Sequence, residues 1–515
     1  MKYPYHNFYE LIQKQSHKRG SKVALFDGED KVRYRDILDR ADRLAAFLAS
    51  KGVKRGDKIA LFLRNSSEFI YSIFAVSKLG AVLIPINTFL KGDELSYILE
   101  DSGASLLIAS TTYHKTVSES NAYERCRLVL WEGELEHTDE HNIPFIEALS
   151  TVNDVNLVAS ALDDTAIIIY TSGTTGKPKG AVLSYKNILS NAYSAEMTIN
   201  ITHRDRGIVF LPMFHSFTFS IGVILPMFLG ASIVIVRSLA PFSNIFKQTL
   251  TKRVTLFLGV PDVYAALAKA KLPWYFMWFN RIRIFVSGAA PLQQKTLDAM
   301  SARFKKAVLL EGYGLSESSP AICINTPKKQ KARSVGAAMH GYEIKIVNED
   351  MVELPRGTVG DIIAKGDNIM HEYLNRPEAT AETIIGGWLM TGDMGYMDEE
   401  GFLFIVDRKK DLIISKGINI YPKELEEIID EFDGISASAV IGAQDEKSGE
   451  IPIAYLELDD GVEQIDEQAL KAYMREHLAN FKIPRQIHTL DKLPKNATGK
   501  VLKRELKDMI REDSL

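Results

Sequence analysis

The stretch from residue 165 to residue 180 constrains the fold of this chain more than any other. An apolar, β-branched run, Thr-Ala-Ile-Ile-Ile-Tyr, leads directly into Thr-Ser-Gly-Thr-Thr-Gly-Lys-Pro-Lys-Gly. Glycines let backbone N–H groups approach an anion closely, the hydroxyls add donors, and Lys177 and Lys179 add positive charge. The sequence therefore predicts a nucleotide-phosphate site in this loop.

The same loop differs from a Walker A motif. Its spacing is G-x-x-G-K, and Pro178 follows the lysine where a Ser or Thr would hold magnesium. Proline also opposes a helix beginning at this point, so we predict that the loop joins two strands, the second covering residues 181–183. A Ser- and Gly-rich surface turn is the alternative, and the full string from Tyr170 to Gly180 argues against it.

Length and composition narrow the class of protein. The 515 residues exceed what one hydrophobic core normally supports, so at least two domains are expected. A hydrophobic content of 46% and a net charge of -4 are ordinary for a globular protein and give no sign of a nucleic-acid partner. The only cysteines, Cys126 and Cys323, cannot build a disulfide framework, and the first residues lack the apolar core of a signal peptide. We expect a cytoplasmic location.

Strand-like and helical stretches alternate along the chain. A strand pattern at 58–63 precedes a helical pattern at 67–79, which Gly80 ends, and a second strand pattern follows at 81–85. Similar apolar runs recur at 105–109, 232–236 and 283–287. The pattern predicts an α/β fold in which layered sheets lie between helices.

The residue pattern changes after Trp388. Short segments there are separated by glycines, and the charge run at 407–411 follows them. A solvated turn would explain that run if it stood alone. Helices at 422–432 and 467–478 and strands at 437–441 and 453–458 would suffice for a small α+β domain. We predict an N-terminal domain of residues 1–406 and a C-terminal domain of residues 407–515.

Two apolar stretches raise the question of membrane contact. The run at 221–236 holds Pro226 and two glycines and is shorter than the roughly 20 residues that span a bilayer, so we expect a buried helix followed by a strand. Residues 274–279 read Trp-Tyr-Phe-Met-Trp-Phe. We expect core packing for this cluster, and a surface that touches membranes or lipid substrates is the alternative.

Six further motifs follow the phosphate loop in a fixed order. They are Leu-Pro-Met-Phe-His-Ser-Phe at 211–217, Ser-Gly-Ala-Ala-Pro at 287–291, Glu-Gly-Tyr-Gly-Leu-Ser-Glu-Ser at 311–318, Thr-Gly-Asp at 391–393, Asp-Arg-Lys-Lys-Asp at 407–411 and Pro-Lys-Asn-Ala-Thr-Gly-Lys at 494–500. In this order the chain resembles the adenylate-forming (AMP-binding) superfamily of acyl- and aryl-CoA ligases, beetle luciferases and peptide-synthetase adenylation domains. It looks most like the fatty-acid–CoA ligases.

The resemblance implies a large N-terminal domain and a small mobile C-terminal lid. It also implies an ATP- and Mg²⁺-dependent acyl-CoA synthetase, in which a carboxylate attacks the α-phosphate, pyrophosphate leaves, and the thiol of coenzyme A then attacks the acyl-adenylate. A stand-alone ligase that loads a carrier protein, an aryl-CoA ligase and a catalytically silent sensor remain alternatives. A homodimer is left open.

The resemblance also assigns the nucleotide site residue by residue. Glu317 would help to hold magnesium, and Ser316 replaces the Thr that is more frequent in the family while keeping the hydroxyl. Asp393 would accept the ribose hydroxyls with support from Arg408, and Tyr313 would stack on adenine. The β- and γ-phosphates would contact Thr171, Ser172, Gly173, Thr174, Thr175, Gly176 and Lys177. Adenine would lie against Gly288, Ala289, Ala290, Glu311, Gly312, Tyr313 and Gly314.

The remaining assignments concern catalysis and the acid. Lys500 would serve the first half-reaction together with Thr171 and Glu317, whereas an ordinary surface lysine is its alternative. Lys410 would be the hinge of the lid, and Gly417 would face the thiol tunnel. His215 is expected near the substrate carboxylate, although a buried neutral core histidine competes, and Phe219 is a candidate gate to an acyl tunnel. The residues expected around the substrate are His215, Phe217, Phe219, Val260, Ser287, Gly288 and Leu315.

Overall fold

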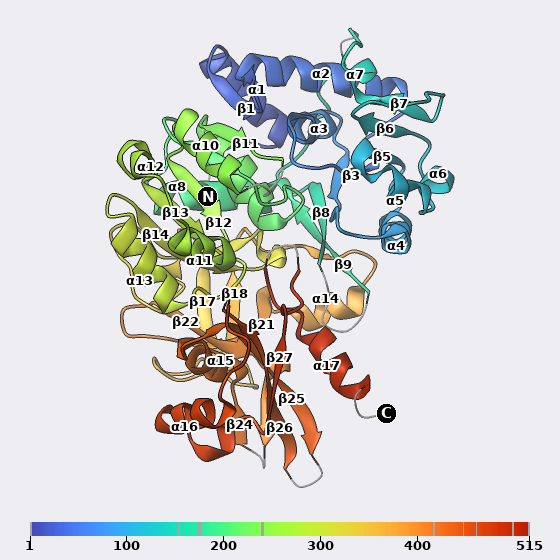
Figure 1. Cartoon of the computed structure of the whole chain (residues 1–515). Helices are drawn as coiled ribbons and strands as arrows, with labels where there is room; N and C mark the ends of the chain where they lie inside the picture. The colour runs from blue at the N-terminus through green and yellow to red at the C-terminus, as the bar shows by residue number, and fades with distance from the viewer. Residues whose placement is uncertain are drawn as a thin grey trace.

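The computed structural model describes residues 3–152, 155–171, 177–237, 242–415, 418–445, 448–459, 461–496 and 499–512 (Figure 1). Its centre is a nine-stranded sheet in which the strands from β14 to β1 run parallel. Parallel strands place their carboxyl ends at one edge, and in open α/β sheets ligands bind there. In spatial order the strands are β16 (Ala337–Ala338), β15 (Ala321–Ile324), β14 (Val308–Gly314), β13 (Ile284–Ser287), β12 (Leu256–Gly259), β10 (Arg206–Val209), β11 (Ser232–Ile235), β1 (Val23–Asp27) and β2 (Asp30–Arg33).

An eight-stranded sheet carries the predicted phosphate loop. Its strands β8 and β9 are antiparallel neighbours joined by that loop, which confirms the prediction of two strands flanking Pro178. The order of the strands is β19 (Glu372–Tyr373), β9 (Lys179–Ser184), β8 (Thr165–Thr171), β4 (Val82–Pro85), β3 (Lys58–Phe62), β5 (Leu106–Ser110), β6 (Val129–Glu132) and β7 (Asn142–Pro144).

Helices form layers inside and outside the two sheets. The largest core cluster joins one face of each sheet through α1 (Phe8–Arg19), α2 (Tyr34–Ser50), α3 (Ser67–Lys78), α8 (Tyr185–Thr198), the π-helix η2 (Thr218–Ile224) and α9 (Leu225–Leu229). A second cluster packs the outer face of the nine-stranded sheet against α10 (Ser243–Thr251), α11 (Pro261–Lys269), α12 (Trp274–Phe279) and α13 (Gln294–Arg303). A third covers the other sheet with α4 (Gly92–Ser102), α5 (His114–Ser118) and α6 (Ala122–Arg125). This layering confirms the predicted α/β fold.

A five-stranded sheet follows in the chain and leads to the C-terminal part. It contains β17 (Glu343–Val347), β18 (Gly360–Lys365), β21 (Trp388–Met397), β20 (Ile384–Ile385) and β22 (Leu403–Arg408), with α14 (Pro377–Thr383) before β20. The charge run at 407–411 begins in β22 and continues into the short 3₁₀ helix η4 (Lys409–Asp411).

The last sheet is also five-stranded and has core clusters of its own, as the predicted small α+β domain requires. In Figure 1 it lies at the bottom, far from the N-terminal helices at the top. Its boundary at residue 407 stays a prediction. Its elements are β23 (Ile413–Ser415), β24 (Ile418–Ile420), α15 (Pro422–Glu431), β25 (Ile435–Asp445), β26 (Gly449–Leu458), α16 (Glu467–His477), β27 (Gln486–Leu490) and α17 (Lys503–Glu512).

The two apolar stretches have different outcomes. The run at 221–236 forms the end of η2, then α9 and β11, all buried, as predicted. In contrast, the core packing expected for residues 274–279 is wrong for most of the cluster. Phe276 is buried, but Trp274, Tyr275, Trp278 and Phe279 are exposed on α12. Among the described residues, no helix combines the length and apolar character needed to cross a bilayer.

Candidate active site

The strands on either side of the phosphate loop fix its two ends. Thr171, the last residue of β8, pairs with Lys179, the first residue of β9, and the Thr171 hydroxyl lies 3.5 Å from the Lys179 carbonyl oxygen. Lys177 and Lys179 each lie over a tyrosine ring, 5.0 Å from the centroid of Tyr97 and 5.2 Å from that of Tyr373. Cation–π contacts of this kind orient an ammonium group. Outside the described residues lie the predicted phosphate ligands Ser172, Gly173, Thr174, Thr175 and Gly176.

A polar network behind the loop was not predicted from the sequence. Asp101 accepts hydrogen bonds from the Tyr170 hydroxyl at 2.8 Å and from Arg376 at 2.8 Å. Arg376 also donates to the Tyr97 hydroxyl, which itself donates to the Pro178 carbonyl at 3.0 Å. The network ties α4 and the segment before α14 to the loop. Because Tyr97, Asp101 and Arg376 lie outside every recognised motif, no local signal identified them.

Glu317 is held by a side chain that the sequence did not indicate. The Tyr373 hydroxyl donates to Oε1 of Glu317 at 2.7 Å, and burial together with this carboxylate raises the pKa of Tyr373. Tyr373 therefore stays a donor at physiological pH. Next to Glu317, the Ser316 hydroxyl lies 3.0 Å from that of Ser216, which joins the 311–318 and 211–217 motifs.

The donor set around Glu317 fits magnesium bound to phosphate. The second oxygen of Glu317 has no hydrogen bond to any residue that the structure describes. Mg²⁺ is usually held by one or two carboxylates together with substrate phosphates, rather than by a cage of protein ligands. Accordingly, no cluster of three or more His, Cys, Asp or Glu ligands occurs in the described ranges.

Strand register brings the predicted ribose ligands together. Asp393 on β21 is the direct partner of Arg408 on β22, and Arg408 Nε lies 3.3 Å from Asp393 Oδ1. The Tyr313 hydroxyl donates to Asp393 Oδ2 at 2.6 Å, and burial and this carboxylate raise the pKa of Tyr313. Each carboxylate oxygen can accept two hydrogen bonds, so Asp393 retains capacity for ribose hydroxyls.

Close approaches explain the glycines of two motifs. A Cβ on Gly314 would lie 1.7 Å from the Pro320 carbonyl oxygen, and one on Gly288 would lie 3.1 Å from the Phe217 ring. Ala289 has a φ of 70°, which is uncommon for a residue other than glycine. The parallel register of β13 and β14 pairs Ser287 with Glu311. At these strand ends the structure gathers the predicted adenine residues Gly288, Ala289, Ala290, Glu311, Gly312, Tyr313 and Gly314.

Glu311 is a partly buried residue at the end of β14, among the predicted adenine residues. Its side chain accepts a hydrogen bond from the Leu292 backbone N–H at 3.3 Å. Burial raises the pKa of Glu311 to about 7, and the positive charge of Lys423 opposes the shift. Glu311 therefore changes protonation near neutral pH, which the sequence alone did not indicate.

Lys500 lies in the C-terminal part of the chain, within the electrostatic influence of the predicted ribose ligands. It follows a turn in which Gly499 N–H bonds to the Asn496 carbonyl, and Lys495 pairs with Val501 across the turn. Burial lowers the pKa of Lys500 to about 7, and the charge of Arg408 lowers it further while that of Asp393 opposes it. Lys500 therefore lies close enough to Arg408 and Asp393 to respond to their charges.

The two other residues predicted for the lid differ in outcome. Lys410 lies in η4, directly after β22, and burial lowers its pKa. It occupies the link between the last strand of the large part and the first strand of the small sheet. Gly417 lies outside the described residues.

Of the two phenylalanines expected around the substrate, Phe217 lies beside the predicted adenine residues and Phe219 lies in the core. His215 Nδ1 lies 3.3 Å from the Phe217 backbone N–H, and burial lowers the pKa of His215 to about 4, so this imidazole is neutral at physiological pH. Phe217 packs over Gly288. Phe219 is fully buried against Phe8 of α1, with ring centroids 6.1 Å apart.

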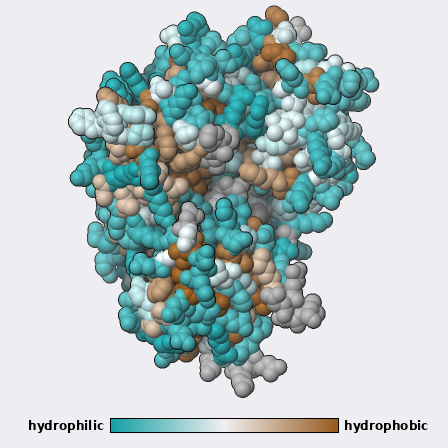
Figure 2. All heavy atoms as spheres, viewed as in Figure 1, coloured by the Kyte–Doolittle hydropathy of each residue, from teal (hydrophilic) through white to brown (hydrophobic). Residues whose placement is uncertain are grey.

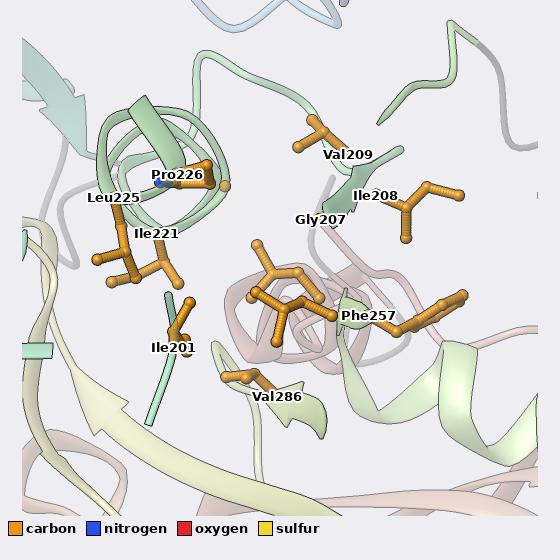
Figure 3. Close-up of a pocket in the computed structure, with 12 residues that line it drawn as sticks. Ile201, Gly207, Ile208, Val209, Ile221, Leu225, Pro226, Phe257 and Val286 are labelled. Atoms are coloured by element: carbon orange, nitrogen blue, oxygen red, sulfur yellow. The ribbon is translucent and has the colours of Figure 1, made fainter. Parts of the chain in front are cut away.

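An apolar cavity of about 30 Å³ lies between η2, α9 and the nine-stranded sheet. Ile221 and Leu225 on the helical side face Val286 on β13, whereas the Phe257 ring points away from them into the outer core cluster (Figure 3). Val260 and Leu315, which were expected around the substrate, pack in two other core clusters. Every lining residue is apolar or glycine: Ile201, Gly207, Ile208, Val209, Ile221, Gly222, Leu225, Pro226, Leu256, Phe257, Leu258 and Val286.

Comparison with known proteins agrees with this geometry. Residues 12–374 match the AMP-binding enzyme family, and residues 424–500 match the AMP-binding enzyme C-terminal domain. A feruloyl-CoA synthase from Amycolatopsis sp. is 32% identical, covering 94% of this chain and 95% of that protein. A long-chain-fatty-acid–CoA ligase from Mycobacterium tuberculosis is 33% identical over 93% of each chain. The o-succinylbenzoate CoA synthetase from Bacillus subtilis, solved with its acyl-adenylate, superposes with a TM-score of 0.86 at 30% identity over 98% of each chain.

The chain therefore belongs to the AMP-binding enzyme family, within the adenylate-forming superfamily of acyl-CoA synthetases. It has the superfamily's fold, a large α/β N-terminal domain with a smaller C-terminal domain. It is an AMP-forming acid–thiol ligase that uses ATP and coenzyme A and proceeds through an acyl-adenylate.

Proposed function

We propose that the acid activated by this ligase is a medium- or long-chain fatty acid. The observation that carries the proposal is the cavity beside β13, whose lining holds no polar side chain. A hydrocarbon tail gains free energy from burial in such surroundings, whereas a second carboxylate or a phenol would lose its hydration without a partner. Of its lining residues, Val286 directly precedes Ser287 in the chain, and Ile221 follows Phe217 by four positions.

The cavity must enlarge on its helical side before a long tail can enter. The cavity of about 30 Å³ accepts only a short piece of hydrocarbon, so a longer tail requires η2 to shift. π-Helical turns are frequent at functional sites, and their packing is less regular than that of an α-helix. We place the gate at Phe217, whose ring lies against Gly288, instead of at Phe219, which packs in the core.

Two anions must meet for the acid to be activated, and the described side chains supply the opposing charge. We propose that Lys500 contacts the carboxylate and the α-phosphate, because its ammonium group lies within the field of Asp393 and Arg408. Asp393, held by Tyr313 and Arg408, would orient the ribose. Neutral His215 would border the carboxylate without adding a charge of its own.

We assign the remaining nucleotide contacts by position. Glu317, fixed by Tyr373, would hold Mg²⁺, which neutralises phosphate charge when bound. Thr171 and Lys177 would contact the outer phosphates at the ends of their loop. The domain boundary at residue 407 and the hinge at Lys410 fit the position of η4 between the two sheets. A cytoplasmic location is supported by two buried, unpaired cysteines, Cys126 and Cys323.

The substrate is tested by mass spectrometry of products formed from ATP, Mg²⁺, coenzyme A and a panel of short, medium, long-chain, aromatic and dicarboxylic acids. We expect fatty acyl-CoA products. Products confined to aromatic acids or to succinylbenzoate would overturn the proposal in favour of an aryl-CoA ligase, and acyl-adenylate without thioester would favour a carrier-protein acceptor.

The variant Gly222→Val tests whether the cavity holds the tail. A Cβ on Gly222 already lies 3.2 Å from Val209 Cγ2 and 3.3 Å from Leu258 Cδ2, so a larger side chain must occupy the cavity. We expect kcat/KM for long acids to fall about tenfold or more, while short acids are spared. An equal loss for all chain lengths would indicate a folding defect or a tail bound elsewhere.

A further inference from the structure

The most exposed aromatic cluster of the molecule lies on one short helix. The exposed fractions on α12 are 71% for Trp274, 47% for Tyr275, 75% for Trp278 and 68% for Phe279. Large apolar residues exposed singly are common, but four within six positions form a contiguous patch that marks an interaction site. In Figure 2, pale side chains of near-neutral hydropathy gather at the upper left, over α12.

The helix is anchored so that this face is held outward. Phe276 is 1% exposed and packs edge to face on Phe246 of α10, with ring centroids 5.3 Å apart. Pro273 precedes the helix and fixes where it begins. The exposed rings therefore belong to a supported surface element and keep their outward position without losing much conformational freedom on binding.

The charged residues of the segment that carries the aromatic face are all basic. From Tyr264 to Arg283 the chain carries four basic residues and no Asp or Glu. Lys269 and Arg283 pair with acids elsewhere, Asp459 and Asp205. Lys271 and Arg281, exposed on either side of α12, form no ion pair with any described residue. Trp and Tyr favour the headgroup region of bilayers, and free cations beside them attract anionic lipid.

We propose that α12 and its flanking cations dock the protein on an anionic membrane surface. The helix has six residues, so it would lie in the headgroup layer as an interfacial element and not insert across the bilayer. The proposal goes beyond the choice of acid, because binding to a bilayer is measured without ATP, coenzyme A or substrate.

Tryptophan fluorescence gives a direct test in the full-length protein. Of the four tryptophans, Trp131 is fully buried and Trp388 is not exposed, so quenching by brominated phospholipid reports on Trp274 and Trp278. We expect strong quenching with vesicles of phosphatidylcholine and phosphatidylglycerol and weak quenching with phosphatidylcholine alone. No quenching on the mixed vesicles would overturn the proposal.

Vesicle co-sedimentation separates the roles of the rings and the charges. Trp274→Ala with Trp278→Ala should abolish binding, and Lys271→Glu should weaken it about fivefold. The matched controls are Phe481→Ala, an exposed aromatic elsewhere, and Lys115→Glu, an exposed lysine on α5, both of which should bind as the wild type does. If the tryptophan variant kept vesicle binding, the membrane proposal would fail. If the variant instead converted a dimer to a monomer in light scattering, α12 would be a protein contact, and the proposal would fail as well.

Discussion

The surroundings of Lys500 determine whether its side chain is charged at neutral pH. Its ammonium group lies within the electrostatic influence of Asp393, Arg408 and Lys410, and burial lowers its pKa to about 7. Because a lysine is cationic below its pKa, the free enzyme carries the charge needed for adenylation below about pH 7 and loses it above. A bound phosphate would raise the pKa again, so the effect belongs to the free enzyme.

We expect kcat/KM for ATP–pyrophosphate exchange to fall as pH rises through about 7, since kcat/KM reports groups of the free enzyme. Lys500→Arg should remove this fall, because guanidinium stays protonated. Lys500→Ala should reduce adenylation about a hundredfold or more while largely sparing thioester formation from supplied acyl-adenylate. Lys492→Ala, an exposed lysine of the same domain, is the control. An equal loss of both half-reactions would contradict the proposed role.

Tyr373 offers a second residue-scale prediction because it acts through Glu317. Tyr373→Phe removes the hydrogen bond of 2.7 Å to Glu317 and keeps the ring beneath Lys179. We expect the Mg²⁺ concentration for half-maximal activity to rise about tenfold with little change in thermal stability. Titration of the exchange rate with Mg²⁺ measures this, and an unchanged midpoint would show that Glu317 does not hold the metal.

The sequence identified the motif residues but not the side chains that position them. Glu317 and Asp393 lie in recognisable strings, whereas Tyr373 is 56 residues from Glu317 along the chain and belongs to no motif. Such a contact depends on β19 joining β9, and no local pattern encodes that pairing. The sequence could not separate Phe217 from Phe219 for a related reason, since only the packing around η2 decides which ring faces Gly288.

At the scale of elements, the close contact between β14 and β15 is the most demanding. A Cβ on Gly314 would lie 1.7 Å from a backbone oxygen, which cannot rotate away as a side chain would. We expect Gly314→Ala to destabilise the protein by about 1–3 kcal/mol and to weaken nucleotide binding. Gly207→Ala in the same sheet is the control, because a Cβ there meets nothing within 4 Å. Thermal melts with and without ATP compare the two variants, and equal melting temperatures would refute the argument.

Whether a segment forms a helix or a strand was easier to predict than which of its side chains are buried. The helix at 67–79 and the strands at 58–63 and 81–85 correspond to α3, β3 and β4 within a residue or two, because their apolar periodicity and Gly80 act locally. Residues 274–279 form a helix whose six side chains are all apolar, so periodicity could not show which face packs. Only the position of α10 determines that Phe276 is buried and Trp278 is not.

At the scale of the whole molecule, the small domain rests on α11 and α13 of the large one. Nζ of Lys495 in the small domain lies 3.1 Å from Oδ2 of Asp262 on α11, and Nζ of Lys269 on α11 lies 2.8 Å from Oδ1 of Asp459 in the small domain. Each of these exposed ion pairs contributes only about 0–1 kcal/mol to the free energy of docking. The more enclosed contact is that of Asp430 on α15, whose Oδ2 accepts from the Gln293 amide at 2.5 Å.

Asp430 should make docking of the small domain depend on pH. Burial raises its pKa to about 7, whereas an exposed aspartate has a pKa of about 3.9. Between those values the docked state binds more protons than the released state, so docking weakens as pH rises towards 7 and changes little above it. Lys500 and Glu311 titrate in the same range, so the measurement belongs in a Lys500→Ala, Glu311→Gln background.

We expect hydrogen exchange of the α13 and α15 amides, corrected for its intrinsic pH dependence, to show protection that declines from about pH 5 to about pH 7. Asp430→Asn should remove the decline, because the neutral amide oxygen accepts from Gln293 at every pH. The neighbouring Glu431→Gln, which alters an exposed pair with Arg333 at 3.5 Å and a hydrogen bond of 3.5 Å from the Tyr473 hydroxyl, should keep it. If the decline persisted in Asp430→Asn, another group would control docking, and the raised pKa of Asp430 would reflect burial within the small domain alone.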